Sequence, residues 1–152
     1  MAGTRKNRVP VKLVPSLDGA PKMPSRAHPD DAGWDLYVSE KVTIPAHGFA
    51  DVPSGVHVQL PNGYWGFLTG RSSTIRKRGL LVVTGIIDTG YTGELFSAVQ
   101  NLTPEPVTLE AGERVAQLIL LPNSTAASLL HQVEEFAGSS TRGGAGFGSS
   151  GL

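Results

Sequence analysis

The chain contains no cysteine among its 152 residues, which excludes disulfides, cysteine nucleophiles and zinc sites with cysteine ligands. Its charge shows no excess of one sign, because 13 basic residues balance 13 acidic ones. Proteins that bind nucleic acid usually carry a basic face, so nucleic acid is not an expected partner. No apolar run reaches the ~20 residues of a membrane helix, and no apolar signal-peptide core is present. We therefore expect a soluble, intracellular protein, cytoplasmic or otherwise, that does not bind membranes.

Glycine and proline are abundant instead, with 19 and 11 residues, and they make long helices improbable. Short runs of β-forming residues alternate with turn signals such as Pro61-Asn62-Gly63. Regularly spaced short strands are typical of a sandwich, a jelly roll or a small barrel. The sequence therefore predicts an all-β fold with strands at 9–14, 42–45, 56–60, 64–68, 80–83, 94–100, 107–109 and 114–121.

One short helix interrupts this pattern. Residues 72–78 are expected to form it, with Ser72 or Ser73 as the N-cap and Gly79 as the stop signal. Arg71 and the two serines at its start could bind an anion, or they could be an ordinary cap with a surface arginine. A second, weaker helix is indicated at 126–131.

The last part of the chain differs in composition from the rest. We expect one β-domain over residues 1–136 and a flexible arm over 137–152, because a segment rich in glycine and serine cannot pack a core. Such a tail often has no specific function. Here, however, Arg142, Phe147 and two serines could clamp a phosphate and stack on a base.

Two aspartates are candidates for catalysis or metal binding. Asp35 and Asp88 each stand in a segment flanked by glycines, where an aspartate commonly serves only a turn. Asp88 follows the apolar residues Ile86 and Ile87 directly, so the end of a strand could position it as a general base. The four histidines show no metal-ligand spacing.

Taken in order, five segments resemble the five motifs of the trimeric dUTPase family. They are AGWDL at 32–36, GRSSTIRKRGL at 70–80, GIIDTGYTGEL at 85–95, GERVAQLIL at 112–120 and RGGAGFGSSG at 142–151. The resemblance implies a jelly-roll-like, distorted β-barrel that assembles as a homotrimer. Its active sites would lie between subunits, with the first, second and fourth motifs from one chain, the third from a neighbour and the arm from the remaining subunit.

The same resemblance implies a reaction, the Mg²⁺-dependent hydrolysis of dUTP to dUMP and pyrophosphate. This would limit uracil incorporation into DNA and supply dUMP for thymidylate synthesis. Asp88 would activate the attacking water, and Asp35 would hold Mg²⁺ through bound waters. The matching positions also imply contacts with the phosphates or the nucleoside at Arg71, Ser72, Ser73, Gly85, Ile87, Tyr91, Gln117, Arg142, Phe147, Gly148, Ser149 and Ser150.

Two alternatives remain open at this stage. The related dCTP deaminases resemble the chain at residues 70–73, but they need a glutamate five residues after the position of Gly93, where this chain has Ala98. A regulatory trimer that responds to nucleotides is the other alternative, and such a role could coexist with catalysis.

Overall fold

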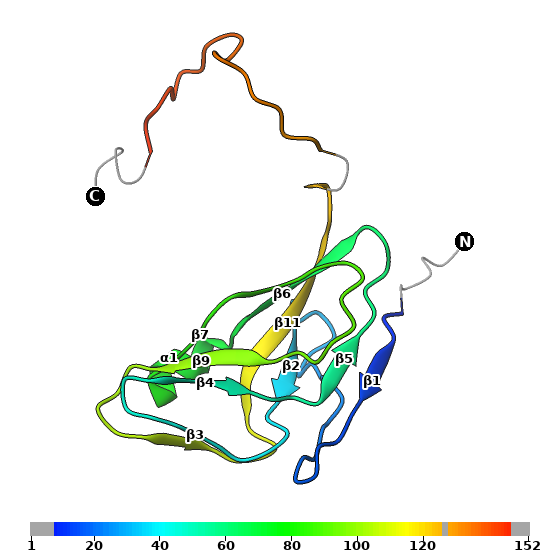
Figure 1. Cartoon of the computed structure of the whole chain (residues 1–152), viewed down its shortest axis with the longest axis vertical. Helices are drawn as coiled ribbons and strands as arrows, with labels where there is room; N and C mark the ends of the chain where they lie inside the picture. The colour runs from blue at the N-terminus through cyan, green and yellow to red at the C-terminus, as the bar shows by residue number, and fades with distance from the viewer. Residues whose placement is uncertain (1–7, 126–127, 147–152) are drawn as a thin grey trace.

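The computed structural model describes residues 8–125 and 128–146 (Figure 1). Within them lie eleven strands and one helix, so the prediction of an all-β fold with one short helix is confirmed. The elements are β1 (Val11–Leu13), β2 (Gly33–Tyr37), β3 (Val42–Ile44), β4 (Phe49–Val52), β5 (Val56–Val58), β6 (Tyr64–Gly70), α1 (Ser72–Arg78), β7 (Leu80–Val82), β8 (Gly85–Ile87), β9 (Ser97–Asn101), β10 (Val107–Leu109) and β11 (Arg114–Pro122).

The strands form four antiparallel sheets, ordered β2-β11-β6-β8, β4-β9-β7, β1-β5 and β10-β3. These sheets are not closed into one barrel, which corrects the expected closure of the jelly-roll-like fold. Apolar side chains from most of the strands, such as Leu68, Leu80 and Leu109, fill a common core. Each fully buried side chain of this size stabilises the fold by about 1.5–3 kcal/mol.

Three strands lie outside the predicted ranges: β8, which the sequence indicated only as an apolar strand end before Asp88, and two that were not expected at all, one of which holds a candidate residue. Asp35 lies in the middle of β2 and not in a turn, because β2 pairs with β11 on one side and with Ser25 on the other. The second unexpected strand is β4, which pairs with β9.

The segment from 80 to 91 contains two strands of different sheets. Strand β7 pairs with β9, whereas β8 pairs with β6, so the two strands belong to different sheets and part at residues 83–84.

The helix α1 ends as predicted but begins differently. Gly79 is the C-cap, with φ of 63°, and its amide donates to the Ile75 oxygen at 3.0 Å. The N-cap is Arg71, not Ser72 or Ser73, and no side chain caps the helix. Contacts with β11 fix the start instead, since the Arg71 amide and the Thr74 hydroxyl both donate to the Val115 oxygen, at 3.2 and 2.6 Å.

Beyond β11, the described residues 128–146 lie outside the sheets as an extended segment (Figure 1). Residues 128–146 contain no helix or strand, so the weaker helix indicated at 126–131 is wrong for residues 128–131; residues 126–127 lie outside the described ranges. No helix in the described part of the chain is long and apolar enough to cross a membrane.

Candidate active site

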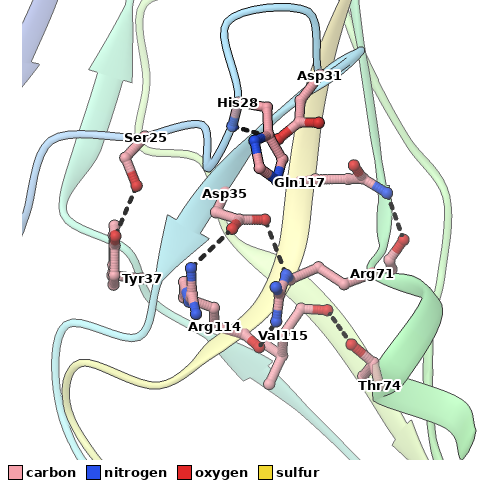
Figure 2. Close-up of polar contacts among 11 residues, drawn as sticks. Ser25, His28, Asp31, Asp35, Tyr37, Arg71, Thr74, Arg114, Val115 and Gln117 are labelled. Atoms are coloured by element: carbon pink, nitrogen blue, oxygen red, sulfur yellow. Dashed lines mark hydrogen bonds and ion pairs between the residues drawn. The ribbon is translucent and has the colours of Figure 1, made fainter.

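A polar cluster occupies one end of the sheet β2-β11-β6-β8. Asp35 of β2 lies opposite Gln117 of β11, which in turn lies opposite Thr69 of β6. Paired residues on adjacent strands point to the same face. The side chains of Asp35 and Gln117 therefore share a face beside the start of α1, as Figure 2 shows.

Asp35 is held by two arginines. One carboxylate oxygen, Oδ1, accepts a hydrogen bond from Nε of Arg71 at 2.8 Å, and the other, Oδ2, accepts one from Nη1 of Arg114 at 3.2 Å (Figure 2). The Asp35 side chain is only 13% exposed, against 28% for Arg71 and 41% for Arg114. Two cations around one anion leave a net charge of +1, which favours a polyanionic ligand.

Arg114 is the residue that the sequence reasoning missed. It lies at an irregularity in the pairing of β11 with β2, between Arg114 and Ala116. A bulge of this kind turns a side chain away from its regular direction. The Arg114 main-chain oxygen also accepts a weak hydrogen bond from Nη1 of Arg71 at 3.4 Å. The fourth motif therefore supports Arg71 as well as Asp35.

Gln117 is positioned by a glycine on the neighbouring strand. Its Nε2 donates to the main-chain oxygen of Gly70 at 3.0 Å. A Cβ placed on Gly33 would lie 2.2 Å from Oε1 of Gln117, so a larger residue would displace the amide. The glycine of the first motif therefore makes room for the glutamine of the fourth.

Ser72 and Ser73 stand beside this cluster in the first turn of α1. In the part of the chain that the structure describes, neither hydroxyl has a protein hydrogen-bond partner. Both groups remain available to a ligand that contacts Arg71.

Asp88 lies far from this cluster in the same chain. Ile87 of β8 is opposite Gly66 of β6, so Asp88 follows at the level of Trp65, four residues along β6 from Thr69. Strand β8 is also three strand spacings from β2. With about 3.3 Å per residue and about 4.8 Å between strands, roughly 20 Å separate Asp88 from Asp35. One small substrate cannot contact both residues of one chain.

The segment after β8 forms a tight turn. The amide of Tyr91 donates to the Asp88 oxygen at 3.1 Å, and Gly90 takes φ of 93° as the third residue of the turn. The Tyr91 hydroxyl donates to the Glu94 oxygen at 2.9 Å, and its ring covers Gly93, where a Cβ would lie 2.4 Å from that hydroxyl. The structure thus places Asp88 directly after an apolar strand, as predicted, with Tyr91 beside it.

The candidate residues of the arm are only partly described. Arg142 is exposed, and its Nε donates to the Ala145 oxygen at 2.8 Å within the arm. Phe147, Gly148, Ser149 and Ser150 lie outside the described residues. Within one chain, the described part of the arm extends away from the polar cluster (Figure 1).

The residues present fit a hydrated metal bound together with a substrate, and not a metal caged by protein. Among residues 8–125 and 128–146, no group of three or more histidine and acidic side chains could hold an ion. Asp35 offers hard carboxylate oxygens, but both already accept hydrogen bonds from arginine. Mg²⁺ retains waters readily and is commonly held by one or two carboxylates plus substrate phosphates.

These features define a β-domain with a positively charged polar cluster at one end of a sheet. The dUTPase family model matches residues 20–151. The deoxyuridine 5'-triphosphate nucleotidohydrolase of Corynebacterium jeikeium is 40% identical over 150 residues, with 96% of each chain covered. The chain therefore belongs to the dUTPase family.

Solved structures agree with this assignment. The dUTPase of Staphylococcus bacteriophage 80alpha with dUPNHPP matches with a TM-score of 0.85 and 36% identity, covering 96% of this chain and 99% of that one. A dUTPase mutant from phage phi11 of S. aureus, described as revealing the coordination of a structural Mg(II) ion, matches with a TM-score of 0.75 and 31% identity. That match covers 86% of this chain and 99% of the phage chain.

Proposed function

We propose that the protein hydrolyses dUTP to dUMP and pyrophosphate, with Mg²⁺ as the metal ion. The observation that supports this most directly is the family match over residues 20–151, which includes both Asp35 and Asp88. In a cell, this reaction removes dUTP before uracil enters DNA and provides dUMP as a precursor of thymidylate.

The cluster around Asp35 is the proposed site of the triphosphate. Its net positive charge and the hydroxyl groups of Ser72 and Ser73 suit phosphate oxygens. Arg71 can turn from Asp35 toward the phosphates, because Arg114 also binds that carboxylate. Asp35 would then hold Mg²⁺ through bound waters, and the ion would offset negative charge on the phosphates. Gln117 would contribute a further polar side chain to the site, next to Asp35 on the sheet.

We propose that each site is shared between subunits of a homotrimer. The distance of roughly 20 Å between Asp35 and Asp88 in one chain, from the strand geometry, is too long for one catalytic site. A neighbouring chain can supply Asp88 instead, and the arm at 137–152 can reach from the remaining subunit because its described part, residues 137–146, lies beyond the sheets (Figure 1). Arg142 would then grip the γ-phosphate with Gly148, Ser149 and Ser150, and Phe147 would close over uracil.

The proposed chemistry is an in-line displacement at the α-phosphorus. Asp88 accepts a proton from water as the water oxygen forms a bond to the α-phosphorus. The bond between that phosphorus and the α-β bridging oxygen breaks, and the electron pair leaves with pyrophosphate. Asp88 is exposed, and within the described residues its carboxylate accepts no protein hydrogen bond, so it is free to bind a water. A base in hydrogen-bond reach typically contributes 10²–10⁴-fold to the rate.

Uracil would bind where β7 and β8 part. Each strand pairs with another sheet, so the segment between them can offer main-chain groups to the base edge, at Gly85 and Ile87. Cytosine would leave some of these groups unpaired, at about 1–3 kcal/mol each. Tyr91 would lie against the deoxyribose and exclude a 2′-hydroxyl.

The substrate assay tests this proposal. Purified protein with Mg²⁺ should release pyrophosphate from dUTP, with dCTP, dTTP and UTP almost inert. Intact dUTP would refute the proposal, and ammonia from dCTP would identify a deaminase instead. The chain has Ala98 at the position of the deaminase glutamate, so that position offers no carboxylate for deamination.

A further inference from the structure

The turn that carries Asp88 is attached to the rest of the molecule on both sides, but by different means. On its C-terminal side the attachment is extensive. Nδ1 of His57 bonds the Thr92 oxygen at 2.8 Å, the Glu94 carboxylate accepts from the Gly55 amide at 2.7 Å, and the Leu95 amide donates to the Val56 oxygen at 2.8 Å. The region after the turn is therefore fixed to β5.

On its N-terminal side the turn follows the strand pairing of β8 with β6, and a side-chain hydrogen bond extends this attachment. The ladder between β8 and β6 ends at Ile87, one residue before Asp88. The half-buried hydroxyl of Thr89 then donates to the main-chain oxygen of Tyr64, the first residue of β6. This bond continues the contact with β6 past the last paired residue.

We propose that Thr89 is a positioning residue for Asp88, which acts by holding the turn against the end of β6. This inference rests on the proposed dUTP hydrolysis. Thr89 follows Asp88 directly, so a shift of Thr89 rotates the peptide that sets the direction of the Asp88 carboxylate. Proton transfer depends on a distance of about 2.6–3.2 Å between base and water, and small displacements of the turn lengthen it. The Thr89 hydroxyl itself is already engaged with the protein and does not touch the substrate.

The test compares three variants in the full-length protein. Thr89→Val keeps the size and β-branching of the side chain but removes the hydroxyl, and Thr89→Ser retains the hydroxyl. Thr92→Val is the matched control, because Thr92 lies in the same loop. Its hydroxyl has no hydrogen-bond partner among the described residues.

We expect Thr89→Val to lower kcat for dUTP by roughly three- to tenfold, the loss that corresponds to one ordinary hydrogen bond. The KM for dUTP and the affinity for a non-hydrolysable dUTP analogue should remain within about twofold, since the bond orients a base and does not bind substrate. Thr89→Ser should recover most of the kcat, and Thr92→Val should leave kcat unchanged.

Three results would overturn the inference. In the first, the kcat of Thr89→Val equals that of Thr92→Val. In the second, Thr89→Ser loses as much as Thr89→Val, which would point to side-chain shape and not to the hydroxyl. In the third, wild-type protein leaves dUTP intact, and this result alone also removes the proposed function.

Discussion

Replacing Arg114 by glutamine should lower the stability of the fold only slightly but should raise the Mg²⁺ concentration that turnover requires. The change removes the guanidinium that binds Oδ2 of Asp35, a carboxylate that is 13% exposed. Because the Arg114 side chain is 41% exposed, solvent screens the pair and its contribution to folding is about 0.5–1 kcal/mol. For a chain of this length such a loss lowers Tm by about 1–4 °C.

The effect on the apparent affinity for Mg²⁺ should be larger than the effect on folding stability. Arg71 would remain the sole partner of Asp35 within the described cluster and could not turn to the phosphates without leaving the carboxylate unsupported. Loss of a residue that orients a metal-binding carboxylate commonly costs on the order of tenfold or more in metal affinity or activity. We therefore expect the Mg²⁺ concentration for half-maximal turnover to rise about tenfold.

Arg78→Gln is the matched control for this experiment. Arg78 pairs with Glu113 at a similar exposure of 33%, and its Nη2 also donates to the Thr108 oxygen, but it does not contact Asp35. The assay is pyrophosphate release against Mg²⁺ concentration, with Tm measured on the same samples. If Arg114→Gln showed the Mg²⁺ dependence of Arg78→Gln, the reasoning about Asp35 would be refuted.

The remaining predictions concern the base, Gln117, the arm and the metal. Asp88→Asn should abolish turnover but retain nucleotide binding by calorimetry; full activity would remove its role as the base. Gly33→Ala should displace Gln117 and raise KM for dUTP at least several-fold, since a Cβ would lie 2.2 Å from Oε1; an unchanged KM would show that Gln117 does not contact the substrate. Deleting 141–152 should leave a trimer, by light scattering, with severely reduced turnover, and an unimpaired truncation would contradict a role for the arm. Chelation by EDTA should stop turnover and excess Mg²⁺ should restore it, whereas activity that persists in EDTA would exclude the metal from the reaction.

The fold class and the position of Asp88 at a strand end were predictable from the sequence. Strongly apolar runs such as Gly85-Ile86-Ile87 identify strands, and a polar residue directly after such a run lies at a strand end, as Asp88 does. Gly79 identified the end of α1 because few other residues adopt its left-handed conformation readily.

The misses arose where tertiary contacts decide local structure. Gly33-Trp34-Asp35 has the composition of a turn, yet pairing with β11 and Ser25 makes it part of a strand. The N-cap of α1 is set by the Val115 oxygen and not by a serine. The approach of Arg114 to Asp35 depends on a register shift in β11, and no sequence pattern reveals such a contact between residues 79 positions apart.

The most direct test of the account is complementation between two inactive variants. Trimers of Asp35→Asn and trimers of Asp88→Asn should each be inactive on dUTP. When the two chains are co-expressed in equal amounts and assemble at random, about a quarter of the shared sites should contain both intact aspartates. The account therefore predicts recovery of about a quarter of the wild-type rate. Mixed assemblies that remain as inactive as their parents would place both aspartates in one chain's site and contradict it.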